Sequence, residues 1–214
     1  MVRIINQNMT IPILWEDAHF LIVHKPAGLP TIPGQDQTES LLGAFPTCHA
    51  VHRLDQRVSG LVLLAKSAED MTAATRLFQR GKVQKTYHAI TMQIPQQESP
   101  LTHWLLQKGS KSLVAKTEKP AYLKSILHYE LIRSSERYHL FEITLKTGRF
   151  HQIRAQMAAS GAPIVGDVKY GFKRTTPDGS IFLQASGLAF VHPFTQETIH
   201  IELPIPTLWT KYGI

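Results

Sequence analysis

The apolar residues of this chain fall mostly into short runs of strand length, and only two segments favour a helix. The runs at 19–25 and 61–65 are short, apolar and rich in branched side chains, which is typical of buried strands. Residues 83–91 alternate like a strand whose two faces are both mixed. We therefore expect an α+β fold, in which a few helices flank a mixed, largely antiparallel sheet.

Further strands are expected in the second half of the chain. Residues 121–132 and 138–146 predict a hairpin that turns at Ser134-Ser135-Glu136. Two short strands are expected at 181–183 and 188–191, and a last strand at 198–203. The intervening segment 95–119 is polar, so we expect it to be peripheral.

The two helices are indicated by their ends. Ser67 is a suitable N-cap, with Asp70 three residues later, and Gly81 is a suitable stop. The segment 151–160 has helical composition and is followed by Gly161 and Pro163. Residues 26–46 form a long loop rich in Pro and Gly, of a kind that is usually functional or mobile. No repeat or linker is evident, so a single domain over residues 1–214 is expected.

The composition narrows the choice of partner and compartment. The 214 residues include 23 Lys and Arg against 16 Asp and Glu, a formal charge of +7 that favours polyanionic partners. The single cysteine, Cys48, excludes an internal disulfide and fits a reducing compartment. The first residues do not resemble a signal peptide, and no apolar stretch is long enough to span a bilayer. We expect a soluble, cytoplasmic protein that does not associate with membranes.

A first candidate site surrounds Asp55. This residue lies in a short polar stretch before a buried strand, with Arg53 and Arg57 two residues away on either side. Neighbouring guanidinium groups favour the ionised carboxylate, and such a carboxylate can act as a nucleophile or a general base. The alternative is a surface loop aspartate in an ordinary salt bridge.

Two later segments also combine polar groups with element ends. In Lys85-Thr86-Tyr87-His88-Ala89, an aromatic ring beside a cation could stack on a base and contact a phosphate, although a half-buried core tyrosine is the alternative. In the segment 147–154, a glycine turn opens a helix with arginines nearby, which is a plausible anion site. His151 and Arg154 are three residues apart and share a helix face. A solvated basic helix start is the alternative there.

Taken together, the motifs resemble the RluA-type family of RNA pseudouridine synthases, in the family's order and over residues 13 to 206. The matching segments are Lys25-Pro26-Ala27-Gly28-Leu29, His52-Arg53-Leu54-Asp55, Ser59-Gly60-Leu61, Lys85-Thr86-Tyr87-His88-Ala89, Gly148-Arg149-Phe150-His151-Gln152-Ile153-Arg154, Pro163-Ile164-Val165-Gly166-Asp167 and His192-Pro193.

The resemblance implies an isomerase that converts uridine to pseudouridine in RNA, with tRNA or 23S-type ribosomal RNA as substrate. Asp55 matches the catalytic carboxylate, Tyr87 the tyrosine that stacks on the target base and can take part in proton transfer, and Arg154 the basic partner of the carboxylate. Arg53 matches the residue that helps to displace the nucleotide from its stack, and Leu183 a residue lining the base pocket. Five further residues are expected to contact RNA: His52, Lys85, Arg149, His151 and Gln152. No cofactor or metal is implied, and a monomer is the simplest expectation.

The chain departs from the family pattern in places. Val58 and Phe150 stand where a small hydroxyl residue is common, Ala155-Gln156 where a branched residue and histidine are usual, and His24 where asparagine is frequent. Many relatives carry an RNA-binding domain of the S4 type before the catalytic core. Because core-like sequence begins near Ile13, we expect none here and expect RNA selection by the catalytic domain or a partner.

Three other functions fit the motifs less well. A non-catalytic RNA-binding protein of the same fold would not need to keep Asp55, Tyr87 and Arg154 together. A metal-dependent hydrolase is suggested by the eleven histidines, but neither a carboxylate cluster nor a zinc spacing accompanies them. A thiol nucleophile at Cys48 beside His49 is disfavoured, because adjacent residues usually point apart.

Overall fold

The computed structural model describes residues 2–6, 9–34 and 39–214. The chain is 39% strand and 16% helix, which confirms the α+β class with few helices. It divides into two compact units. Unit 1 comprises Met1–Lys85 and Ala185–Leu203, and unit 2 comprises Thr86–Gln184 and Pro204–Ile214.

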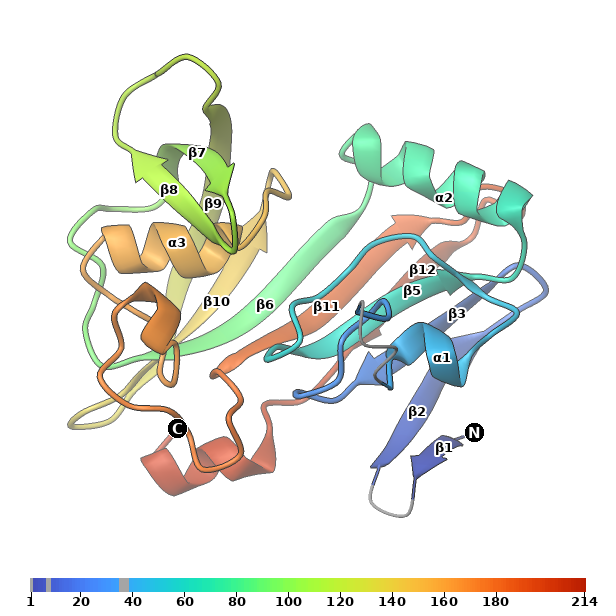
Figure 1. Cartoon of the computed structure of the whole chain (residues 1–214), viewed down its shortest axis with the longest axis horizontal. Helices are drawn as coiled ribbons and strands as arrows, with labels where there is room; N and C mark the ends of the chain where they lie inside the picture. The colour runs from blue at the N-terminus through green and yellow to red at the C-terminus, as the bar shows by residue number, and fades with distance from the viewer. Residues whose placement is uncertain (1, 7–8, 35–38) are drawn as a thin grey trace. The chain divides into compact units, whose positions relative to one another are not determined.

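Unit 1 is built on a sheet with the strand order β1-β2-β3-β5-β11, where β12 also pairs with β11 and β4 with β5 (Figure 1). The strands are β1 (Val2–Asn6), β2 (Met9–Glu16), β3 (Phe20–Lys25), β4 (His49–Ala50), β5 (Ser59–Ala65), β11 (Leu183–Val191) and β12 (Thr198–Glu202). The pair β3 and β5 is antiparallel, with Phe20 opposite Ala65 and Lys25 opposite Gly60. This register places the end of β3 beside the start of β5, where the Asp55 segment enters the sheet.

The core of unit 1 lies between this sheet and the helix α2 (Ala68–Gln79), and a short helix α1 (Leu41–Ala44) precedes β4. The expected cap is confirmed, because the Ser67 hydroxyl accepts a hydrogen bond from the Asp70 amide at 3.1 Å. Gly81 follows the helix with a φ of +65°. Among the described residues, one cluster of this core consists of ten buried residues: Phe20, Ile22, Leu61, Leu63, Ala65, Ala74, Val83, Leu188, Phe190 and Ile199.

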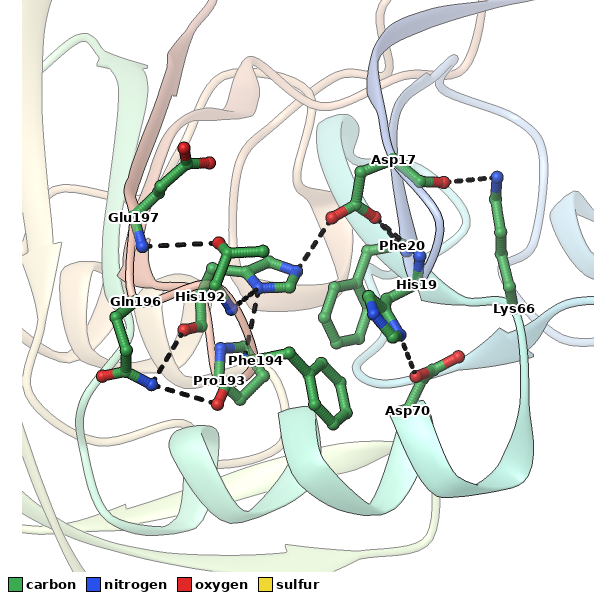
Figure 2. Close-up of polar contacts among 11 residues, drawn as sticks. Asp17, His19, Phe20, Lys66, Asp70, His192, Pro193, Phe194, Gln196 and Glu197 are labelled. Atoms are coloured by element: carbon green, nitrogen blue, oxygen red, sulfur yellow. Dashed lines mark hydrogen bonds and ion pairs between the residues drawn. The ribbon is translucent and has the colours of Figure 1, made fainter.

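Two histidine–aspartate contacts fasten the turn between β2 and β3 (Figure 2). The buried His192 lies 2.9 Å from Asp17, and its Nδ1 accepts the amide of Thr195 at 3.0 Å. His19 Nδ1 lies 2.7 Å from Asp70, and its ring stacks on Phe194 at 4.2 Å. The motif His192-Pro193 therefore links the end of β11 to the turn that precedes β3.

Unit 2 has the strand order β6-β10-β9-β7-β8 (Figure 1). Its strands are β6 (Gln84–Thr91), β7 (Leu101–Lys108), β8 (Lys111–Ala115), β9 (Leu123–Ser134) and β10 (His139–Leu145). The helix α3 (Gln152–Ala159) contacts β7 and β8, and the 3₁₀ turns η1 (Val168–Tyr170) and η2 (Thr207–Tyr212) follow later in the chain. The predicted hairpin is confirmed: β9 and β10 pair antiparallel and turn after Ser134.

The structure differs from two expectations about elements. The segment 95–119 is peripheral as expected, because it lies at the end of the strand order, but it forms the strands β7 and β8 and buries Leu101 and Leu105. The strands expected at 181–183 and 188–191 are one continuous strand, because Gly187 stays in the ladder opposite Glu202. In the described part of the chain, no helix is long and apolar enough to cross a membrane.

Candidate active site

The Asp55 segment of unit 1 is fixed by the loop that follows β3. Thr31 is buried and holds the main chain of Leu54 on both sides, donating from its hydroxyl to the carbonyl at 2.9 Å and accepting from the amide at 3.1 Å. The Gly28 amide donates to the Gln56 carbonyl at 2.7 Å. Asp55 lies between these two tethered residues, so its backbone is held in place on both sides.

The side chain of Lys25 also supports the Asp55 segment. It is fully buried, and Nζ donates to the carbonyls of Pro26 at 2.9 Å, Leu29 at 2.7 Å and Gln56 at 3.4 Å. Burial lowers the pKa of the Lys25 ammonium from 10.5 to about 7, although the Asp55 carboxylate raises it in part. The contacts make Lys25 a structural link between two motifs, a role that sequence reasoning did not identify.

His52 is largely buried in the same unit. Its Nε2 accepts the Leu63 amide at 3.0 Å, and its ring stacks on Phe78 with 4.8 Å between centroids. Burial, with a smaller contribution from Lys85, lowers the pKa of His52 to about 3. His52 is therefore neutral at physiological pH and joins the Asp55 segment to α2.

Two other expected RNA contacts of unit 1 differ in exposure. Arg53 is exposed, as a residue that meets a nucleic acid must be. Lys85 is partly buried, with its ammonium 5.9 Å from the centre of the Phe78 ring. Burial lowers the pKa of Lys85.

Unit 2 carries the other two residues matched to catalysis. Tyr87 lies on β6 opposite Ile143 of β10 and is 9% exposed. Arg154 lies in the first turn of α3 and is 4% exposed. Its Nε donates to Asp167 Oδ2 at 2.7 Å, and its Nη2 donates to Asp167 Oδ1 at 2.8 Å. Asp167 belongs to the motif Pro163-Ile164-Val165-Gly166-Asp167 after α3, and no role is predicted for it from the sequence.

The turn before α3 is shaped by buried Gln152. Its Oε1 accepts the Thr147 hydroxyl at 2.8 Å and the Arg149 amide at 3.0 Å, and its Nε2 donates to the Ile126 carbonyl at 3.2 Å. Each of these bonds is internal to the protein, so the contacts assign Gln152 to the shape of the turn. Arg149 itself is exposed.

His151 occupies a special backbone position at the start of α3. Its φ is +51°, which is in the left-handed region, and its ring stacks on Phe150 with 3.8 Å between centroids. Its Nδ1 lies 3.0 Å from the Tyr170 hydroxyl. Leu183 is buried, at 3% exposure. Within residues 2–6, 9–34 and 39–214, no group of three or more His, Cys, Asp or Glu side chains is arranged to hold a metal ion.

Comparisons with known proteins agree on one family. The profile of the family described as RNA pseudouridylate synthase matches residues 19–159. The RNA pseudouridine synthase YhcT of Bacillus subtilis, itself uncharacterized, is 32% identical over 92% of this chain and 69% of its own length. The ribosomal large subunit pseudouridine synthase C of Buchnera aphidicola is 31% identical over 96% of this chain and 71% of its own length.

Two further comparisons extend the likeness. The tRNA pseudouridine synthase C of Vibrio parahaemolyticus is 31% identical, over 94% of this chain and 93% of its own length. The solved structure of human RNA pseudouridylate synthase domain containing 4 has the same fold, with a TM-score of 0.77, 21% identity, and coverage of 92% of this chain and 90% of that one. The chain therefore belongs to the RNA pseudouridylate synthase family, whose members are isomerases.

Proposed function

We propose that this protein isomerises specific uridines of tRNA or large-subunit ribosomal RNA to pseudouridine, with Asp55 as the catalytic carboxylate. The observation that carries the proposal is the family match over residues 19–159, which includes Asp55, Tyr87 and Arg154. The relatives named for ribosomal and for transfer RNA have the same identity to this chain, 31%, so both substrates stay in the proposal.

The isomerisation requires few catalytic groups. The C–N glycosidic bond must break, the base must turn, and a C–C bond must form to the same ribose. Asp55 acts either by attacking the ribose or by assisting proton abstraction there. Thr31 and Lys25 support this role because they hold the main chain on both sides of Asp55, and a catalytic group must be held in place to be effective.

The other matched residues complete the proposal. Tyr87 stacks on the target base, and Arg154 is the basic partner of the carboxylate. Arg53 helps to take the uridine out of its stack, at a cost of a few kcal/mol. Stacking on an aromatic ring can recover about 1–3 kcal/mol of that cost. Lys85, Arg149 and the net charge of +7 support binding to the RNA backbone.

The reaction balances without redox change, so we propose that it needs neither a cofactor nor a metal, and that a monomer acting in the cytoplasm suffices. The direct test is a pseudouridine map of total RNA from cells with and without the gene. Loss of one or a few defined sites in the deletion strain, restored by the wild-type gene, is the expected result. An unchanged map across tRNA and ribosomal RNA contradicts the proposal.

A non-catalytic RNA-binding role is the second candidate, and the basic composition favours it equally well. It differs in one measurement, because such a protein binds RNA without producing pseudouridine. A metal-dependent hydrolase would instead lose activity in a chelator, whereas pseudouridine formation by Asp55 should be unaffected.

A further inference from the structure

The Arg154 side chain lies in a buried polar site, the Arg154 cradle, formed by Asp167 and Tyr170 in the segment after α3. Its guanidinium and the Asp167 carboxylate make two parallel hydrogen bonds, at 2.7 and 2.8 Å. Arg154 is 4% exposed and Asp167 is fully buried. A bidentate pair of this kind fixes the plane of the guanidinium as well as its position.

Tyr170 forms a second wall of the cradle. Its ring centre lies 5.1 Å from Arg154 Cζ, within the range of a cation–π contact. Its hydroxyl accepts the Ser112 amide at 2.7 Å and lies 3.0 Å from His151 Nδ1. The ring is therefore anchored at its far end by β8 and by the start of α3.

The backbone around Asp167 is as constrained as its side chain. Gly166 has a φ of +83°, and a Cβ there would lie 2.8 Å from the Ser180 carbonyl oxygen. The Asp167 amide donates to Ile164, and its carbonyl accepts the amides of Tyr170 at 3.0 Å and Phe172 at 3.1 Å. Gly166 thus lets the chain turn tightly enough to aim Asp167 at Arg154.

A buried ion pair is weak evidence for stability, because apolar residues of the same volume are often as stable. It is better suited to orienting a group. Asp167 accepts hydrogen bonds from Nε and from one N–H of Nη2. Because the guanidinium is planar and rigid, these two bonds also fix the directions of its other N–H donors.

We propose that Asp167 is a positioning residue that, with Tyr170, holds the Arg154 guanidinium in its working orientation. The proposal rests on the proposed function, because Arg154 matters there as the basic partner of Asp55. It adds a dependence on two residues to which the motifs assign no role.

The first test is Asp167→Asn, which keeps the volume but turns one of the two acceptors into a donor facing Arg154. We expect the single-turnover rate to fall roughly 10- to 100-fold, as for a misplaced catalytic group, while the Kd for RNA changes less than about twofold. Tyr170→Phe keeps the ring and loses the hydroxyl anchor, so a smaller loss is expected. Rates equal to wild type in a folded Asp167→Asn protein overturn the proposal.

The second test starts from Arg154→Ala, so its first readout remains available if Asp167→Asn does not fold. Arg154→Ala leaves Asp167 facing a vacated space, which free guanidinium can fill. We expect a few millimolar guanidinium to raise the melting temperature of Arg154→Ala and to restore part of its rate, whereas the same concentration of KCl does neither. In Arg154→Ala/Asp167→Asn both effects should vanish.

The proposal is overturned if the single and double variants respond equally to guanidinium, or if neither variant responds. The melting temperature is read without RNA. If wild type forms no pseudouridine, the proposed function fails while the binding of guanidinium can still be scored.

Discussion

At the scale of single residues, Lys25 is a buried cation surrounded by main-chain carbonyls. Burial lowers its pKa to about 7 in the folded protein, against 10.5 for the free side chain. Between these values the unfolded chain holds a proton that the folded chain has lost. The free energy of unfolding should therefore rise with pH across this window, by at most about 1.4 kcal/mol per pH unit from this group.

Lys25→Met removes the titrating group and keeps most of the volume. Urea unfolding from pH 6 to 10.5 should give a wild-type curve that climbs relative to the variant above pH 7. Lys66→Met is a matched control, because that lysine is about a third exposed and binds Glu16. A constant difference between wild type and Lys25→Met at every pH contradicts the lowered pKa.

A variant of Tyr87 can test stacking on the base and proton transfer separately. Tyr87 is nearly buried on β6, and Tyr87→Phe keeps the ring while removing the hydroxyl. If the hydroxyl takes part in proton transfer, the single-turnover rate should fall by about 10- to 100-fold or more while the RNA Kd stays within about threefold. Equal losses of binding and rate would indicate a purely structural tyrosine.

Motifs indicate residue types but not their distant contacts. The carboxylate, the tyrosine and the arginine are predictions from motifs, which contain no information on partners far along the chain. The bond from Arg154 to Asp167 spans 13 positions, and the clamp from Thr31 to Leu54 spans 23. For the bond between Arg154 and Asp167, the available signal was a glycine followed by an aspartate after a helix. For the contact between Thr31 and Leu54, the sequence contained no signal.

At the scale of elements, the close approach of β5 and β11 depends on Gly60. Its φ is +126°, and a Cβ would lie 2.3 Å from the Ala185 carbonyl oxygen. Gly60→Ala should therefore cost both backbone strain and a steric clash, together about 3 kcal/mol or more in urea unfolding. Gly81→Ala is the matched control, with a φ of +65° and no atom within 4 Å of the added Cβ, so strain alone applies, about 1 kcal/mol. Equal costs would contradict the contact.

Elements with strong local signals were predicted well. The cap at Ser67 and the hairpin between β9 and β10 both depend on residues close in sequence. The strands β7 and β8 were not expected, because the segment 95–119 contains many polar residues and because β7 pairs with β9, which lies further along the chain. The continuity of β11 was not predicted, because the strand is carried through Gly187 by pairing with Glu202 of β12, a residue further along the chain.

At the scale of the whole molecule, the net charge of +7 should make RNA binding strongly dependent on salt. Arg149 is exposed beside the turn that opens α3, so Arg149→Ala should weaken binding and reduce the slope of log K against log salt by about 0.7–0.9, one phosphate contact. Arg137→Ala, equally exposed but in the β9–β10 turn, is the control and should leave the slope unchanged. The same slope in all three proteins would remove Arg149 from the RNA interface.

We propose that one carboxylate, Asp55, in a segment tethered on both sides, performs the isomerisation. Asp55→Asn changes one oxygen to an amide and leaves the tethers from Thr31 and Lys25 unchanged. The most direct measurement is single-turnover pseudouridine formation on RNA containing the mapped site, with RNA affinity measured in parallel. We expect no detectable pseudouridine from Asp55→Asn and a Kd within about threefold of wild type, since the phosphate contacts of basic side chains remain. Pseudouridine formation by Asp55→Asn at the wild-type rate would contradict it.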